Sequence, residues 1–152
     1  MVTVFRLSKA RHARTAFSGI GARLAGGRWN ARGQAVVYTS SSLALAALET
    51  FVHLQEEFAE LVFVAFSIEV PDGVAIASCR RPPPGWRRQP VPESTMRYGS
   101  AWFEAGETAV LAVPSAVVPS ELNYVLNPAH DGFKRLKISK PWPFTFDARL
   151  WK

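Results

Sequence analysis

One continuous segment, residues 26–49, carries three side chains that together could act on a nucleotide. Arg28 follows a glycine pair, Tyr38 lies in a short run of β-branched and aromatic residues, and Glu49 follows in the next predicted helix. A guanidinium can bind a phosphate through two parallel hydrogen bonds, and an aromatic ring can stack on a flat base. A carboxylate can stabilise a developing positive charge or bind a sugar hydroxyl. This set suits a nucleotide whose glycosidic bond is to be broken.

The elements that must position these groups can be predicted from the same segment. Gly26 and Gly27 allow a tight turn or a close approach of the backbone to another group. Residues 35–39 are β-branched and aromatic, which predicts a strand. The three serines at 40–42 are N-cap candidates for a helix expected at residues 43–58.

The periodicity of that helix leaves the role of Glu49 open. Its apolar face is expected to consist of Leu43, Ala47, Phe51, Leu54 and Phe58, widened by Leu48. Glu49 falls on the polar side near His53, which could pair with it across one turn. Periodicity alone therefore describes a solvated glutamate and an exposed histidine. A functional Glu49 requires this polar edge to face a cleft.

Two polar residues outside the segment are further candidates. Arg6 lies between Phe5 and Leu7 on a first predicted strand and points to the opposite face, where it could reach a phosphate or be a surface or ion-paired arginine. Ser115 follows Pro114 at the end of another predicted strand. It is either a pocket residue or a simple turn former.

The rest of the chain is predicted to contain mostly strands. They are expected at residues 3–7, 61–68, 74–77, 108–113, 133–138 and 144–146, with 61–68 buried on both faces. The proline-rich run 80–92 predicts a surface loop pinned by Trp86, followed by a short helix capped by Ser94. Asn123 and Asn127 are expected in polar turns. One long helix among many strands, without regular alternation, favours an α+β fold in a single domain over residues 1–152.

Composition limits the classes of protein that need to be considered. Hydrophobic residues make up 48% and charged residues 20% of the 152 residues, which predicts a packed core. No apolar run reaches ~18 residues, no secretory leader pattern is present, and Cys79 is the one cysteine, so we expect a cytoplasmic protein without disulfides or a cysteine metal cluster. The net charge of +6 attracts phosphates in general, and this fits a nucleic acid, an anionic dinucleotide or an acidic protein partner.

The chain also resembles the RES domain toxins of bacterial RES–Xre toxin–antitoxin pairs. The strongest pieces are GGRWN at 26–30, VVYTS at 36–40, ALETFVHL at 47–54 and VPSAVVPSELNYVLNPAH at 113–130. Weaker pieces are FRLSKA at 5–10, GIGA at 19–22, YGSAW at 98–102 and FDARL at 146–150. They occur in order and cover nearly the whole chain. Ala31 stands where the family often has proline.

The resemblance implies a fold, a substrate and a set of site residues. The expected fold is similar to that of ADP-ribosyltransferases, with a split mixed sheet and a few flanking helices. The expected substrate is NAD, cleaved by hydrolysis or by phosphorolysis with inorganic phosphate as co-substrate, and no metal or further cofactor is expected. The family motifs assign catalytic roles to Arg28, Tyr38, Glu49 and Ser115. We expect the substrate to be bound by Arg6, Trp29, His53 and Asn123.

The resemblance also implies a partner, and it leaves alternatives open. The partner is an Xre-type helix-turn-helix antitoxin that covers the active site, within a complex that could contain a toxin homodimer; no direct nucleic-acid or membrane contact is expected. A related alternative is an ADP-ribosyltransferase that modifies a protein. Two non-enzymatic alternatives are a basic nucleic-acid binder that uses its five tryptophans and an interaction module with a vestigial site.

Overall fold

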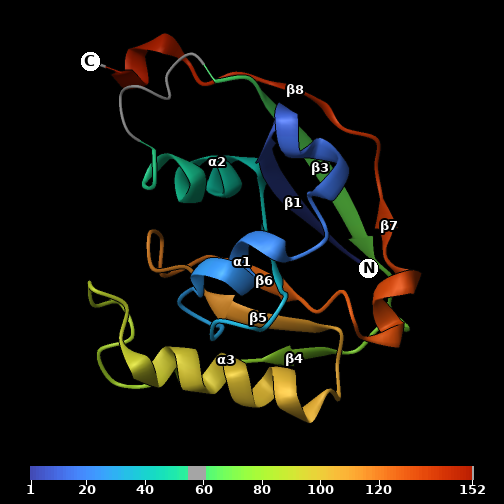
Figure 1. The fold of residues 1–152 in the computed structure, drawn as a ribbon, viewed down its shortest axis with the longest axis vertical. Helices are drawn as coiled ribbons and strands as arrows, with labels where there is room; N and C mark the ends of the chain where they lie inside the picture. Colours follow the sequence, from blue (N-terminus) through green and yellow to red (C-terminus); the bar gives the residue numbers. More distant parts are fainter. Residues whose placement is uncertain (55–60, 152) are drawn as a thin grey trace.

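The computed structural model describes residues 1–54 and 61–151, which fold around one mixed sheet of eight strands (Figure 1). The strands are β1 (Val2–Lys9), β2 (Val37–Ser40), β3 (Phe63–Val70), β4 (Ile76–Ser78), β5 (Val110–Pro114), β6 (Leu122–Leu126), β7 (Lys137–Ile138) and β8 (Trp142–Phe144). The helices are α1 (Ile20–Ala25), α2 (Leu43–Phe51) and α3 (Glu93–Ala105), with short 3-10 turns at Ala10–Thr15, Asp131–Arg135 and Ala148–Trp151. None of the helices in these residues is long and apolar enough to cross a membrane.

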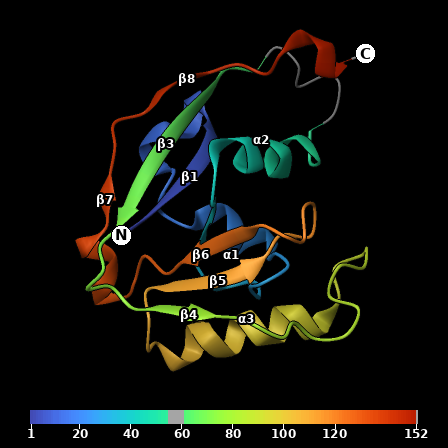
Figure 2. The same ribbon diagram turned by 180° about the vertical axis from the view of Figure 1, so that it is seen from behind.

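The sheet consists of two parts joined by a short seam. Its order is β4-β5-β6-β2-β1-β3-β7, and β8 also pairs with β3. Strands β1 and β3 pair along their whole length, whereas β1 and β2 share the single registered pair Phe5 and Ser40. Figures 1 and 2 show β1 and β3 running in a different direction from β5 and β6. The parallel β4–β5 pair makes the sheet mixed. The predicted α+β class with a split mixed sheet is confirmed.

The two faces of the β5–β6 part of the sheet are covered differently. One face carries Val110, Ala112 and Leu126 and joins the main core with Val4 and Ile68. The alternate residues of the same strands join a second cluster that includes Trp29 and the α3 aromatics (Tyr98, Trp102 and Phe103). Figures 1 and 2 show α3 running along β4 and β5. The second face is therefore the one that the residues 26–30 turn and α3 both cover.

Helix α2 begins as predicted and ends earlier than predicted. Ser42 caps it, and its hydroxyl oxygen accepts a hydrogen bond from the Leu45 amide at 3.0 Å. The helix ends at Phe51, whose ring lies 5.3 Å from that of Trp151 near the end of the chain. The part of the predicted helix beyond residue 54 lies outside the described residues.

Several predicted elements need correction. Residues 122–126 form β6 rather than a polar turn at Asn123. Pairing with β2 on one side and β5 on the other stabilises the strand, although the polar Asn123 favours a turn. Helix α1 has no counterpart among the predicted elements. Helix α3 starts at Glu93 after Pro92, so Ser94 is not its cap. Strand β3 begins two residues later than predicted, and it has buried residues on both faces as predicted, with Phe63 and Ala65 in one core cluster and Phe66 and Ile68 in another.

Candidate active site

The carboxylate of Glu49 is held by two side chains from the other half of the chain. The Ser115 hydroxyl donates to Glu49 Oε1 at 2.6 Å, and the Asn123 amide Nδ2 donates to the same oxygen at 2.8 Å. Within the described residues, no hydrogen bond reaches Glu49 Oε2. The prediction of a solvated glutamate, made from periodicity alone, is wrong. Glu49 is half-buried, and the polar edge of its helix faces the ends of β5 and β6.

The position of Glu49 follows from burial of α2 on two sides. Ala47 belongs to the apolar face that packs against Phe63 and Phe144. Leu45 and Ala46, which lie on another side of the helix, are also buried, with Leu45 only 1% exposed. Glu49 lies one turn after these two residues and therefore on their side of the helix. The apolar arc is wider than the projection predicts, and Glu49 sits at its edge.

Ser115 is fully buried, with 0% exposure, where the chain leaves β5. Its hydroxyl oxygen accepts hydrogen bonds from the backbone amides of Val117 at 3.1 Å and Val118 at 3.0 Å. With both amides donating to that oxygen, the hydroxyl proton is directed to Glu49. Ser115 thus forms the turn, as one interpretation predicts, and also holds the Glu49 carboxylate, while its role as a pocket residue stays a prediction.

The turn at residues 26–30 is built around the phenol of Tyr38. The Tyr38 hydroxyl donates to Asn30 Oδ1 at 2.6 Å and accepts from the Trp29 backbone amide at 3.1 Å. A Cβ on Gly27 would lie 2.7 Å from both the Tyr38 hydroxyl and Asn30 Oδ1, so glycine is needed for this close approach. Burial raises the pKa of Tyr38 far above its usual value, so the phenol stays protonated.

Arg28 lies in the electric field of Glu49. Burial lowers the pKa of Arg28, while the Glu49 carboxylate raises it. Arg28 Nη1 donates to two backbone carbonyls of the proline-rich loop (residues 80–92), those of Trp86 at 2.6 Å and Arg88 at 3.2 Å. The guanidinium is therefore a fixed cation beside the carboxylate.

The strand register completes this group of side chains, which we call the Glu49 site (Arg28, Tyr38, Glu49, Ser115 and Asn123). Strands β2 and β6 pair Ser40 with Asn123, and Tyr38 lies two residues before Ser40. Alternation then places Tyr38, Ser40 and Asn123 on one face of the sheet. A guanidinium, an aromatic ring and a carboxylate oxygen that accepts from none of the described residues are thus gathered together. The described residues hold no group of three His, Cys, Asp or Glu side chains suited to a metal ion.

The contacts of Arg6 serve the fold. Its Nε donates to the Ala16 carbonyl at 2.7 Å, and its Nη1 donates to the Tyr38 carbonyl at 2.9 Å. Burial lowers the pKa of Arg6 to about 10. The alternative of a surface or ion-paired arginine is corrected, because the guanidinium joins β1 to β2 across the short seam, while substrate binding by Arg6 stays a prediction.

The structure corrects the substrate-binding role expected of Trp29 and the pairing of His53 with Glu49, while a contact of His53 with substrate stays a prediction. Trp29 is 3% exposed and packs edge-to-face on Tyr98 with ring centroids 5.9 Å apart, so it has almost no surface to offer a ligand. His53 is exposed beyond the end of α2, and no hydrogen bond joins it to Glu49 in the described structure. The helix would have to continue for the two to pair across a turn.

Ser40 and Asn30 are not among the predicted site residues, yet both support the site. The sequence indicates Ser40 only as an N-cap candidate, whereas its hydroxyl donates to Asn123 Oδ1 at 2.7 Å. Asn30 fixes the Tyr38 phenol and donates through Nδ2 to the Ala22 carbonyl at 2.9 Å. The signal for Asn30 is its place directly after a glycine turn, where a short amide side chain can bond the backbone.

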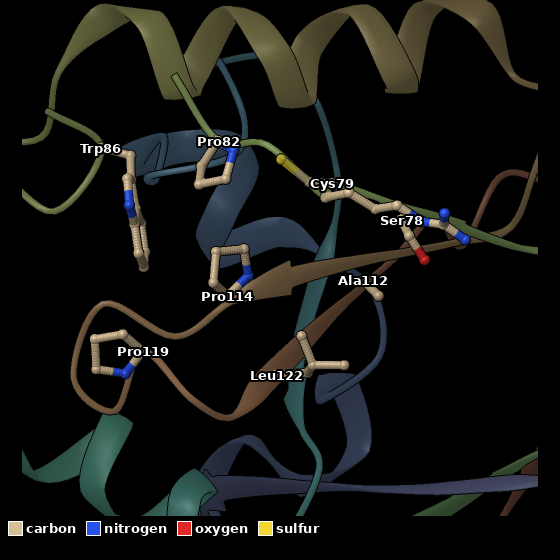
Figure 3. Close-up of a pocket in the computed structure, with 9 residues that line it drawn as sticks. Ser78, Cys79, Pro82, Trp86, Ala112, Pro114, Pro119 and Leu122 are labelled. Atoms are coloured by element: carbon tan, nitrogen blue, oxygen red, sulfur yellow. The ribbon is translucent and has the colours of Figure 1, made fainter. Parts of the chain in front are cut away.

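A separate cavity of about 490 Å³ lies near the ends of β4 and β5 (Figure 3). Its strand residues include Pro114 and Leu122, which alternate with Val113 and Asn123 and so lie on the opposite face of the β5–β6 pair from Asn123. Trp86 also lines it and packs on the second cluster, as expected of a residue that pins the proline-rich loop. None of the five residues of the Glu49 site lines this cavity, although Trp86 belongs both to its lining and to the loop that holds Arg28.

Comparisons with known proteins agree with the architecture. A family model described as the RES domain matches residues 3–147. A protein of Yersinia enterocolitica named "Toxin Res" is 39% identical over 149 residues, which are 97% of this chain and 98% of that protein. The "Prs ADP-ribosylating toxin" of Sphingobium sp. is 44% identical over 137 residues, covering 88% of this chain and 85% of that one. The M. tuberculosis MbcT–MbcA toxin–antitoxin complex contains a chain of similar fold, with a TM-score of 0.75, 21% identity and coverage of 99% of this chain and 86% of that chain.

Proposed function

The chain belongs to the RES domain family, and on that premise we propose that it is the toxin of a toxin–antitoxin pair and cleaves the nicotinamide–ribose bond of NAD. The observation that carries the proposal is the state of Glu49. Two donors fix one carboxylate oxygen, and the other has no donor within the described residues. A fixed carboxylate with one unused oxygen is suited to a group that becomes positively charged during the reaction.

The departure of nicotinamide needs no proton from the protein. Nicotinamide leaves with the electron pair of the C1–N bond, and it leaves as a neutral molecule because its ring nitrogen was cationic. Positive charge then develops at C1 of the ribose, where Glu49 Oε2 stabilises it or holds a ribose hydroxyl. Water or inorganic phosphate supplies the new bond to C1. Hydrolysis yields ADP-ribose and one proton, whereas phosphorolysis yields ADP-ribose 1-phosphate.

The remaining residues of the site have roles that follow from their contacts. Arg28 binds the pyrophosphate through the Nε and Nη2 edge of its guanidinium, because the proline-rich loop holds Nη1. Tyr38 offers its ring to the nicotinamide, since its hydroxyl is already engaged by Asn30 and by the Trp29 amide. Ser115 and Asn123 act through Glu49.

A second candidate is transfer of ADP-ribose to a protein. The Sphingobium relative named as an ADP-ribosylating toxin supports it, at 44% identity over most of both chains. The same site would serve, with a protein side chain as the nucleophile in place of water or phosphate. The two candidates differ only in the acceptor, so the products separate them.

The partner proposed for this toxin is an Xre-type helix-turn-helix antitoxin that covers the Glu49 site. The proposal draws on the family and on the fold shared with a chain of a toxin–antitoxin complex. The antitoxin would need to block access to Arg28 and Glu49. Addition of a cognate antitoxin is therefore expected to stop NAD cleavage by the purified toxin.

One assay tests the proposed function. Purified protein is incubated with NAD, with and without inorganic phosphate, and the products are resolved by mass. Release of nicotinamide is expected, and the mass of the ribose product separates hydrolysis from phosphorolysis. A parallel reaction with labelled NAD and a cell extract detects transfer to a protein. Absence of nicotinamide release in all reactions would rule the proposal out.

A further inference from the structure

Ser40, on β2, belongs to a chain of hydrogen bonds that ends on Glu49. Its side chain is buried, with 3% exposure, and its hydroxyl donates to Asn123 Oδ1 at 2.7 Å. Asn123 Nδ2 in turn donates to Glu49 Oε1 at 2.8 Å. A strand hydroxyl thus reaches the carboxylate through one amide.

In this chain of hydrogen bonds, each group donates towards Glu49, which is the arrangement that a carboxylate, an acceptor at both oxygens, requires. An amide side chain has a donor end and an acceptor end, and a rotation of half a turn would exchange them. In the rotated amide, Oδ1 of Asn123 would face the carboxylate, and two acceptors would meet. The observed orientation has every donor pointing towards Glu49, and Ser40 satisfies the acceptor end of the amide.

Ser115 supplies the second donor to the same oxygen. Its own oxygen accepts from the Val117 and Val118 amides, so its hydroxyl proton is available only to Glu49. Both donors therefore converge on Oε1. A carboxylate held in this way cannot rotate to exchange its oxygens without breaking two hydrogen bonds to a charged group.

We propose that Ser40 and Asn123 form a positioning relay, which together with Ser115 presents Oε2 of Glu49 in one fixed orientation to the ribose. The inference rests on the proposed function, and it reassigns Asn123 from substrate contact to the positioning of Glu49. A relay that acts through Glu49 lowers kcat when it is broken and leaves KM nearly unchanged, because substrate binding by Arg28 and Tyr38 is untouched.

The kinetic test uses Ser40→Ala, Asn123→Ala and their double variant. Loss of the neutral hydrogen bond in Ser40→Ala is expected to lower kcat about 3- to 10-fold, and loss of the donor to the carboxylate in Asn123→Ala about 10- to 100-fold. The double variant should match Asn123→Ala, since Ser40 acts through Asn123. Effects that multiply, or a change confined to KM, would overturn the relay.

Thr39→Val is the matched control. Thr39 is buried on the same strand, points to the opposite face, and donates its hydroxyl to the Tyr124 carbonyl at 2.8 Å. Loss of this hydrogen bond in Thr39→Val should lower the melting temperature about as much as Ser40→Ala does, while kcat stays at the parent value. Equal kcat in Ser40→Ala and Thr39→Val would reduce Ser40 to a structural residue.

A second readout does not depend on NAD cleavage. The side-chain amide of Asn123 gives its own pair of signals in a ¹⁵N-labelled sample, and these should move in Ser40→Ala and in Glu49→Gln but not in Thr39→Val. Unmoved signals in the first two variants would contradict the relay. If the parent protein does not cleave NAD, the proposed function fails, while these signals still decide whether the relay exists.

Discussion

The Ser115 hydroxyl lies 2.6 Å from Glu49 Oε1, although 66 positions of the chain separate the two residues. Glu49 is supplied by α2, which follows β2, and Ser115 by the end of β5. Strand β6 lies between β2 and β5 in the sheet, and its Asn123 contacts the same carboxylate oxygen. The sheet order therefore brings the acid and its two donors together.

Replacement of Glu49 by glutamine should remove most activity and leave the fold intact. The glutamine keeps the shape of the side chain and an oxygen that can accept from Ser115 and Asn123, but it cannot balance the positive charge that develops on the ribose. Loss of one preorganised electrostatic group costs on the order of 10²–10³ in kcat. Nicotinamide release measures this loss, and the melting temperature measures the fold.

Glu93→Gln is the control for this variant. Glu93 is exposed at the start of α3 and pairs only with Arg97, at 2.8 Å, among the described residues. Its neutralisation should leave nicotinamide release unchanged. Comparable losses in both variants would mean that acidity in general, and not the position of Glu49, matters for activity.

The local sequence was sufficient to predict the parts of the site that depend on short-range structure. The glycine turn before Arg28, the strand that carries Tyr38 and the serine cap of α2 were all predicted from neighbouring residues, and the structure contains each of them. The partners of Glu49 could not be derived in this way. Periodicity assumes that one side of a helix faces the core, and α2 is buried on two sides.

Arg28→Lys should weaken substrate binding more than it slows the chemical step. Lysine keeps the charge but cannot make two parallel hydrogen bonds to a phosphate. Loss of one hydrogen bond to a charged group is worth about 1.5–3 kcal/mol, or roughly 10- to 100-fold in KM for NAD. Arg23→Lys, at an exposed position on α1, should leave KM unchanged. An unaltered KM in Arg28→Lys would remove Arg28 from substrate binding.

The same variant should loosen the proline-rich loop. Arg28 Nη1 holds the carbonyls of Trp86 and Arg88, and a lysine ammonium on a flexible stem holds two carbonyls less firmly. Limited proteolysis after the exposed arginines of this loop should therefore be faster in Arg28→Lys than in the parent or in Arg23→Lys. Equal cleavage rates would show that the loop is held by Trp86 packing alone.

The structural contacts of Arg6 and Trp29 were missed from the sequence for one physical reason. Each residue type can bind a nucleotide, and each lies in a motif that the family resemblance brings into the site, but residue type does not reveal what a side chain meets after folding. Arg6 donates to two backbone carbonyls near the seam of the sheet, and Trp29 packs against Tyr98 of α3. Both partners come from other elements, so tertiary packing decides the role of each side chain.

Tyr38→Phe should lower the free energy of unfolding at neutral pH and make that free energy fall less steeply with pH above about pH 10. The change leaves Asn30 Oδ1 without its donor and the Trp29 amide without its acceptor, which costs about 1–3 kcal/mol at neutral pH. In the parent, burial raises the folded-state pKa of Tyr38 above the value of 10.0 expected for the unfolded chain.

The sign of the pH effect follows from that difference. Below pH 10 both states keep the Tyr38 proton and the full stability is present; above pH 10 the unfolded state loses its proton first, so stability falls as pH rises. Thermal melts between about pH 8 and 11 should show a smaller alkaline decrease in Tyr38→Phe, with the remainder due to Tyr98 and Tyr124, whose pKa values burial also raises. Identical slopes would mean that Tyr38 ionises freely in the folded state.

Gly27→Ala should damage the site through the Tyr38 phenol. The new Cβ would lie 2.7 Å from both the Tyr38 hydroxyl and Asn30 Oδ1, so their mutual hydrogen bond at 2.6 Å cannot persist unchanged. Overpacking of this kind costs about 1–3 kcal/mol. Gly21→Ala is the contrasting variant, because nothing lies within 4 Å of its added Cβ and alanine favours a helix over glycine by about 0.5–1 kcal/mol. Melting temperature and nicotinamide release should both fall in Gly27→Ala, whereas Gly21→Ala should be at least as stable and as active as the parent. Equal behaviour of the two variants would mean that the close approach of the turn to Tyr38 is not needed.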